Sequence, residues 1–355
     1  MNEKWSSIAR VQAAIDGKIP DRLPVDLHNF LPAALAADHP VRDVLQSGEL
    51  LAGSMRAAWQ EFGHDMILLE NGTACSAQAC GAEVEYPRDS APVVHKIPHD
   101  RLLDLVNSAP PDPNKSFPMN ELLTATQILS AEIGKHVWIC ARADQGPFSL
   151  AAQLRGIPEL MMDIALGENL DLIQALLEYS SKVVYRFAHA LIEKGGRSTS
   201  IGDSLAGPEL LSPGDYLRFA WPYEKNLIAR LSKDGIILHL HICGDTLVIF
   251  ENMVNTGAPV LEIDHKTDST TAINLSKQRA CLLGNIDTGL LANGSPAEVK
   301  NACRAIIDRW NPLRSFILGP GCAMGAETPT DNIHALVESA VRYGRTPSIY
   351  GEQFS

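Results

Sequence analysis

His241, Cys243 and Cys322 are the side chains of this sequence best suited to bind a metal ion. The first two lie in a His-Ile-Cys-Gly segment at the end of the apolar run 236–242, and the third follows the run 316–318 in a Gly-Pro-Gly-Cys segment. Two thiolates and one imidazole suit zinc, and three protein ligands leave one position open, as in catalytic zinc sites. Because the chain has no Cys-x-x-Cys pair, spacing alone leaves a zinc site and a chance association as equal alternatives.

The other histidines and cysteines have simpler interpretations. His239 alternates with His241 and Cys243, so it points to the same side of one strand, where a core or supporting position is expected. His265 is a candidate proton-transfer group or an ordinary loop histidine. The remaining cysteines are expected to be small buried side chains, with a second metal site at the first two as the less favoured alternative: Cys75, Cys80, Cys140, Cys281 and Cys303.

Alternating strand and helix patterns must position these residues. Strands are predicted at 23–27, 66–69, 137–141, 198–201, 236–242, 259–263, 281–285 and 315–318, with a turn at 144–147. Helices are predicted near 170–193, from Ser212-Pro213 to residue 234, and from Thr328-Pro329 onward. About eight strand–helix units predict an α/β fold of the (β/α)₈ TIM-barrel type, in one domain over residues 1–355, with an N-terminal helical extension and a long Pro-rich insertion at 87–118. A doubly wound open sheet is the alternative.

Polar residues fall where these strands end, and in a barrel those ends share one face that holds the active site. Asp203 and Asn285 are the candidate catalytic or substrate-contacting residues, with Glu70 and Asp264 as weaker candidates. Loop solvation or helix capping is the alternative for all four. The full set at the strand ends is Glu70, Asp144, Asp203, Cys243, Asp264, Asn285 and Cys322, and the aromatic residues that could line a pocket or simply pack are Phe30, Trp221 and Tyr223.

Composition excludes several classes of partner. The chain has 355 residues and a net charge of −12 without a block of Lys or Arg, so nucleic acids and anionic membrane surfaces are not expected partners. No apolar stretch is long enough to span a bilayer. Seven cysteines without regular spacing argue against a disulfide framework and favour a reducing cytoplasm. A homodimer is compatible with the sequence, which does not determine the oligomeric state.

The chain resembles the uroporphyrinogen decarboxylase superfamily, and within it the cobalamin-dependent methyltransferase branch. The resemblance covers nearly the whole length, through residues 20–25, 146–151, 202–204, 211–213, 239–244, 284–287, 317–322 and 327–333. It implies a (β/α)₈ barrel. In the methylcobalamin:coenzyme M methyltransferases of that branch, a His-x-Cys and a later Cys bind catalytic zinc, and His241, Cys243 and Cys322 match them.

The resemblance also implies a reaction. Zinc would assist transfer of a methyl group between a small substrate (a methoxylated aromatic, a methyl halide, a thiol or tetrahydrofolate) and a corrinoid, with Asp203 as an alternative weak fourth ligand. The residues from Asp26 to Leu31 begin like the corrinoid signature Asp-x-His-x-x-Gly but have Leu31 in place of glycine, so the corrinoid is expected on a separate protein. A metal-free decarboxylase is disfavoured because residues 25–33 lack the family's tetrapyrrole-binding arginines. A non-enzymatic zinc- or thiol-binding protein is the third hypothesis.

Overall fold

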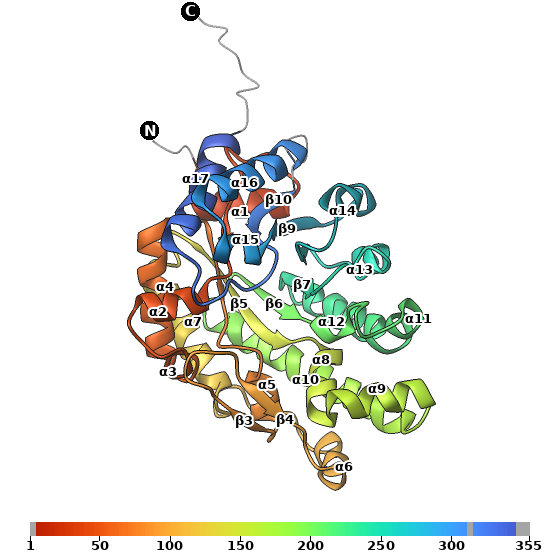
Figure 1. The fold of residues 1–355 in the computed structure, drawn as a ribbon. Helices are drawn as coiled ribbons and strands as arrows, with labels where there is room; N and C mark the ends of the chain where they lie inside the picture. The colour runs from red at the N-terminus through yellow and green to blue at the C-terminus, as the bar shows by residue number, and fades with distance from the viewer. Residues whose placement is uncertain (1–4, 311–314, 346–355) are drawn as a thin grey trace, which may run out of the picture.

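The computed structural model describes residues 5–310 and 315–345, and its centre is a sheet of eight parallel strands (Figure 1). The strand order follows the chain, and a parallel bridge between Val25 and Leu318 brings the first and last edges together into a barrel. This confirms the predicted (β/α)₈ architecture over the open sheet. The strands are β1 (Asp26–Leu27), β2 (Met66–Leu69), β5 (Trp138–Gln145), β6 (Ser198–Gly202), β7 (Leu238–Ile242), β8 (Val260–Ile263), β9 (Cys281–Ile286) and β10 (Phe316–Pro320).

Helices surround the barrel (Figure 1). The longest, α10, has apolar residues at helical spacing on the face that packs inward, and it covers the predicted range in full. Gly167, with a φ of 69°, ends α9 in the left-handed conformation that glycine adopts without strain. The helices that follow or link the strands are α4 (Gly48–Phe62), α5 (Cys75–Ala79), α7 (Met119–Ile133), α8 (Pro147–Arg155), α9 (Ile157–Leu166), α10 (Leu170–Glu193), α12 (Trp221–Lys233), α13 (Phe250–Asn255), α14 (Ser269–Ser276), α15 (Thr288–Asn293), α16 (Pro296–Trp310) and α17 (Thr330–Tyr343).

Shorter elements decorate this framework. The N-terminal extension is the helix α1 (Ser7–Ile15), and α2 (Phe30–Ala36) and α3 (Val41–Leu45) lie between β1 and α4. The predicted Pro-rich insertion contains the second strand of an antiparallel hairpin, β3 (Glu83–Glu85) with β4 (Val93–His95), and the helix α6 (His99–Asn107). Between β6 and α12 lie a 3₁₀ turn at Ser204–Ala206, the single-turn helix α11 (Pro213–Asp215) and a π-helical turn at Tyr216–Ala220.

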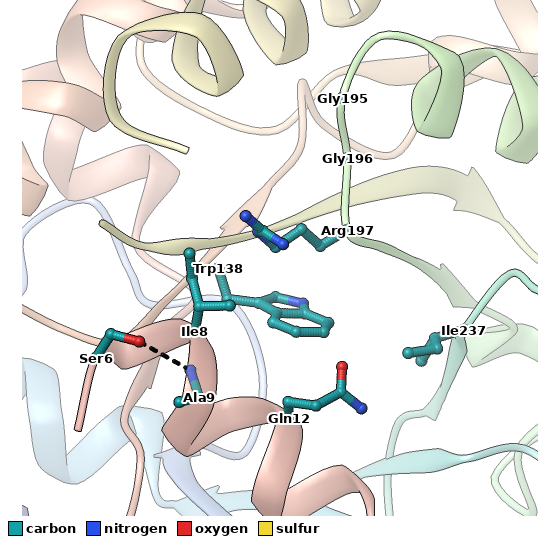
Figure 2. A pocket seen from close by; sticks show the side chains of 9 residues that line it. All are labelled: Ser6, Ile8, Ala9, Gln12, Trp138, Gly195, Gly196, Arg197 and Ile237. Atoms are coloured by element: carbon teal, nitrogen blue, oxygen red, sulfur yellow. Dashed lines mark hydrogen bonds between the residues drawn. The ribbon is translucent and has the colours of Figure 1, made fainter. Parts of the chain in front are cut away.

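The barrel interior is apolar at one end and charged at the other. At the amino-terminal end, Val11 and Ala14 of α1 pack with inward side chains such as Met66, Trp138 and Ile317. A pocket of about 620 Å³ lies beside this apolar cluster (Figure 2). It is lined by α1 and by residues at the starts of three strands. The carboxyl-terminal end, in contrast, holds ionisable side chains, so any polar chemistry belongs to that mouth.

One local expectation needs correction. The turn predicted at 144–147 begins too early, because β5 continues to Gln145 and pairs there with Gly202 across an irregularity in register. Asp144 takes a φ of 63°, a left-handed conformation that aspartate tolerates better than most residues. Within the described residues, no helix is long and apolar enough to cross a membrane.

Candidate metal centre

The three predicted ligands meet at the carboxyl-terminal mouth of the barrel. His241 lies at the end of β7, Cys243 follows it, and Cys322 follows β10. Cys243 Sγ lies 3.1 Å from His241 Nε2 and 3.9 Å from Cys322 Sγ, and the three ligand atoms all lie within 4.8 Å of one another. Two sulfur ligands of a tetrahedral zinc ion lie about 3.8 Å apart, given Zn–S bonds of about 2.3 Å. The spacing therefore fits zinc with little adjustment.

Neighbouring groups orient these ligands. His241 Nδ1 lies 3.1 Å from the backbone carbonyl oxygen of Glu262 on the adjacent strand β8, so this nitrogen is the protonated donor and Nε2 is left for the metal. The Ser204 hydroxyl lies 3.1 Å from Cys243 Sγ. Such outer contacts fix the tautomer of a histidine ligand and the direction of a thiolate.

The electrostatics of the trio favour one thiolate, at Cys243, which in turn raises the pKa of Cys322. A hydrogen bond with Cys322, together with the charge of His241, lowers the pKa of Cys243 to about 3, although burial opposes this. Burial also opposes the charge on His241, but the Cys243 thiolate raises the pKa of His241 to about 9. Without a metal the pair is thus a thiolate and an imidazolium, and a zinc ion would take the place of the imidazolium proton.

The loop after Cys243 is held by the next strand. One oxygen of Asp264 accepts from Gly244 N at 2.8 Å and the other accepts from Lys266 N at 2.9 Å. Asn285 donates its amide to the carbonyl oxygens of Asp264 and Thr267, at 3.2 and 3.0 Å. Asp264 and Asn285 therefore lie at the mouth as predicted, and their hydrogen bonds there are with backbone groups, while Asp264 also lies 3.0 Å from His265 Nδ1. A catalytic role for Asn285 stays a prediction.

Asp203 is fully buried and caps a helix. It accepts from the backbone N–H groups of Phe148 and Ser149 at the start of α8, at 3.3 and 2.6 Å. Burial raises the pKa of Asp203, and burial together with Asp203 raises the pKa of Glu224, which also accepts a 2.6 Å hydrogen bond from the Tyr216 hydroxyl of the π-helical turn. Helix capping, the alternative interpretation of Asp203, accounts for its contacts with Phe148 and Ser149. A catalytic or metal-binding role for Asp203 stays a prediction.

The other candidates lie in packed positions. His239 is fully buried one layer below His241, 3.6 Å from Glu262. Trp221 donates its indole N–H to Asn252 O at 2.8 Å, Tyr223 packs against the core at intermediate burial, and the Phe30 side chain is buried. The five remaining cysteines are all buried, and among the described residues His241, Cys243 and Cys322 form the one cluster of three suitable metal ligands.

Sequence reasoning missed a buried charged network under this mouth. Arg142 of β5 lies 3.2 Å from Glu262 and 3.4 Å from Glu70, and Glu262 also accepts a 2.6 Å hydrogen bond from Ser200. At Glu262 the available signal was a single charged residue within an otherwise apolar strand, whereas Arg142 lies just beyond the predicted strand 137–141 and shares β5 with Asp144. Arg142 lies two residues before Asp144, and Glu262 lies two residues before Asp264. Side chains two residues apart on a strand point to the same side, so both could have been expected to face the inside of the barrel. Ser204, next to the singled-out Asp203, was missed because nothing local marks its contact with Cys243.

Comparison with known proteins gives one family. The model of the family described as uroporphyrinogen decarboxylase (URO-D) matches residues 6–343. The methylcobamide:CoM methyltransferase MtbA of Methanosarcina acetivorans is 31% identical over 235 residues, which cover 64% of this chain and 67% of that protein. The methylcobamide:CoM methyltransferase MtaA of Methanosarcina barkeri is 27% identical over 350 residues, covering 94% and 97%. A uroporphyrinogen decarboxylase of Prochlorococcus marinus is 29% identical over 185 residues, covering 50% and 51%.

Solved structures agree on the fold. A structure described as a methyltransferase from Methanosarcina mazei superposes with a TM-score of 0.87 at 23% identity, covering 96% of this chain and 99% of that one. A B12-independent methionine synthase from Shewanella superposes with a TM-score of 0.57 at 12% identity, covering 89% and 97%. At these identities the likeness establishes the architecture alone.

Proposed function

We propose, from the premise that this chain belongs to the uroporphyrinogen decarboxylase family, that it is a zinc-dependent methyltransferase acting with a corrinoid carried by a separate protein. Its relatives named methylcobamide:CoM methyltransferases make it an enzyme of the corrinoid-dependent methyltransferase class. The reaction would move a methyl group between that corrinoid and a small substrate held at the mouth of the barrel.

The observation that carries the zinc assignment is the convergence of three ligand atoms from β7 and β10 within 4.8 Å. His241 Nε2 and the sulfurs of Cys243 and Cys322 would hold the ion, and the hydrogen bond of His241 to the Glu262 carbonyl already selects the correct nitrogen. When bound, zinc supplies a Lewis acid that lowers the pKa of a substrate thiol or stabilises a leaving atom.

The chain's own residues have defined tasks around that reaction. Ser204 forms a hydrogen bond with the Cys243 sulfur, which would stabilise the negative charge of the thiolate. Asp264 fixes the backbone that follows Cys243. His241 is only 3% exposed and the two cysteines are partly buried, and exclusion of water from the site favours methyl transfer between the corrinoid and the substrate over side reactions with water.

The N-terminal signature region supports a separate corrinoid carrier. His28, at the histidine position of that partial signature, is buried and lies 2.7 Å from the Glu70 carboxylate. A histidine paired in this way inside the barrel mouth is a poor axial ligand for a corrinoid bound on the surface. The same region lacks the arginine cluster that a polyanionic tetrapyrrole needs, which argues against decarboxylation of uroporphyrinogen.

Free methylcobalamin and small thiols test the function directly. Zinc-loaded protein should transfer the methyl group from methylcobalamin to a thiol, or from a methyl donor to cob(I)alamin, with the corrinoid spectrum reporting each turnover. Full zinc occupancy with thiol binding but no exchange in either direction would favour the non-enzymatic hypothesis. Turnover of uroporphyrinogen by the metal-free protein would establish the decarboxylase instead.

A further inference from the structure

Buried carboxyl groups outnumber buried Lys and Arg side chains at the mouth of the barrel. Asp26, Glu70, Asp144 and Glu262 come from four strands or strand ends, and each is 4% exposed or less. In the described part of the chain, Arg142 is the one buried Lys or Arg at this end of the barrel, since the other buried arginines, Arg10 and Arg22, bind Asp65 near the opposite end.

The buried cations of the mouth are already neutralised. Arg142 lies between Glu70 and Glu262, at 3.4 and 3.2 Å. His28 lies against the same Glu70 oxygen at 2.7 Å. Burial acts to raise the pKa of Glu70, but the charges of His28 and Arg142 outweigh it and hold this pKa below its usual value. An anionic substrate group would have to compete with these internal carboxylates for its partner.

The more exposed cations on the rim are paired as well. His265 lies 3.0 Å from Asp264 and 3.6 Å from Asp287, and Lys266 lies 2.7 Å from Glu209. Within the described residues, no Lys, Arg or His side chain at these strand ends is therefore free to bind a substrate carboxylate, phosphate or sulfonate. Recognition of an anion at this mouth would cost at least one existing ion pair.

Hydrogen-bond acceptors, in contrast, are left unused beside Glu70. Oδ1 of Asp144 and Oδ1 of Asn71 are buried without a hydrogen-bond partner. The second oxygen of Asp144 accepts from Ser76 N at 2.6 Å, which fixes the direction of the carboxylate. Burial raises the pKa of Asp144 to about 6. Buried acceptors without partners call for a donor that arrives from outside the chain.

We infer that the small substrate of this enzyme is a cation, an amine or ammonium compound, whose charged end binds at Asp144 and Glu70 while its reacting atom lies at His241, Cys243 and Cys322. The inference rests on the proposed function and specifies its substrate class. An ammonium group has donors only and a positive charge, so it can donate to the free oxygens and is attracted by the carboxylate of Asp144. A sulfonated thiol such as coenzyme M does neither.

Three thiols of equal length test this charge preference. 2-Aminoethanethiol, 2-mercaptoethanol and 2-mercaptoethanesulfonate differ only in a cationic, neutral or anionic end. With Co²⁺ loaded in place of zinc, the thiolate-to-cobalt absorption band gives a dissociation constant for each. We expect the amine to bind at least about tenfold more tightly than the sulfonate. Tightest binding of the sulfonate or of the neutral thiol overturns the inference while leaving the proposed function intact.

Variants at Asp144 and Glu70 show whether the difference in affinity comes from the protein or from the different acidities of the three thiols. Asp144→Asn keeps an acceptor for Ser76 N, and asparagine tolerates the φ of 63° at this position. The ratio of amine to sulfonate affinity should fall by about tenfold in this variant and also in Glu70→Gln, but not in the exposed control Glu327→Gln. An unchanged ratio in both Asp144→Asn and Glu70→Gln overturns the inference. Absence of the cobalt band with all three thiols overturns the inference, and the proposed function falls only if the zinc-loaded protein also fails to exchange a methyl group with the corrinoid in either direction.

Discussion

Cys243 and Cys322 are separated by 79 positions in the chain, and their sulfur atoms lie 3.9 Å apart. They come from β7 and β10, which are three places apart in the order of the barrel strands. The sulfurs can meet because both cysteines follow the carboxyl end of an inward-curving strand, where the ends of all eight strands converge.

Replacing either cysteine should remove the metal. Cys243→Ala or Cys322→Ala leaves two ligands, too few for a stable zinc site, so we expect about one zinc per wild-type chain and none in either variant. Plasma mass spectrometry on protein purified without an affinity metal column measures this. Cys303→Ala, at a buried cysteine of α16, is the matched control and should retain zinc. Full occupancy in Cys243→Ala would refute the ligand assignment.

The Ser204 hydroxyl should strengthen metal binding. Ser204→Ala removes the 3.1 Å contact with the Cys243 sulfur, and loss of such an outer contact weakens metal affinity by about 10- to 100-fold. Competition with a chromophoric chelator measures the zinc dissociation constant. Ser181→Ala, which removes a serine hydroxyl bonded to backbone within α10, should leave that constant unchanged. Equal constants for wild type and Ser204→Ala would remove the proposed role.

Asp203 should stabilise the fold through α8. Asp203→Ala leaves the N–H groups of Phe148 and Ser149 without their acceptor, and loss of a helix cap costs about 0.5–2 kcal/mol of unfolding free energy. Urea denaturation measures the change, and Asp203→Asn, which keeps one acceptor oxygen, should lose less. If Asp203→Ala unfolds at the same urea concentration as wild type but is inactive, the capping role is wrong and the catalytic hypothesis gains support.

His64 should make the protein less stable in acid. Its ring is fully buried and both nitrogens lack partners, and burial lowers the pKa of His64 from 6.5 to about 3. The folded-state pKa is below the unfolded one, so the unfolded chain binds the extra proton and stability falls as pH drops below about 6.5. The loss from this group at pH 5 is about 2 kcal/mol.

Comparison of two histidine variants isolates that contribution. Unfolding free energies measured at pH 7.5 and at pH 5 should differ less in His64→Leu than in wild type, by the amount that His64 contributes. His99→Leu, at an exposed histidine of α6, should keep the wild-type difference. The same pH dependence in His64→Leu and wild type would mean that His64 is accessible to protons in the folded state.

Much of the fold and the candidate metal ligands could be predicted from the sequence because both leave local patterns. The helix of residues 170–193 repeats its apolar residues at helical spacing, and β2 is a short apolar run between polar segments, so each was predicted with its observed bounds. His241 and Cys243 were found by their types and by their place at the end of a strand. Cys322 was found in the same way, as a cysteine that follows the apolar run 316–318.

The surroundings of those ligands were decided by the tertiary structure. Whether Asp203 faces the metal or caps α8, and whether Arg142 lies free or between Glu70 and Glu262, depends on the register of neighbouring strands and on loop paths. A sequence pattern reports the burial and period of one segment, whereas these contacts join segments up to 120 residues apart. The sequence therefore determined which residue types could bind a metal. The charges that surround them at the mouth depend on the tertiary structure, because they come from strand ends that are far apart in the chain.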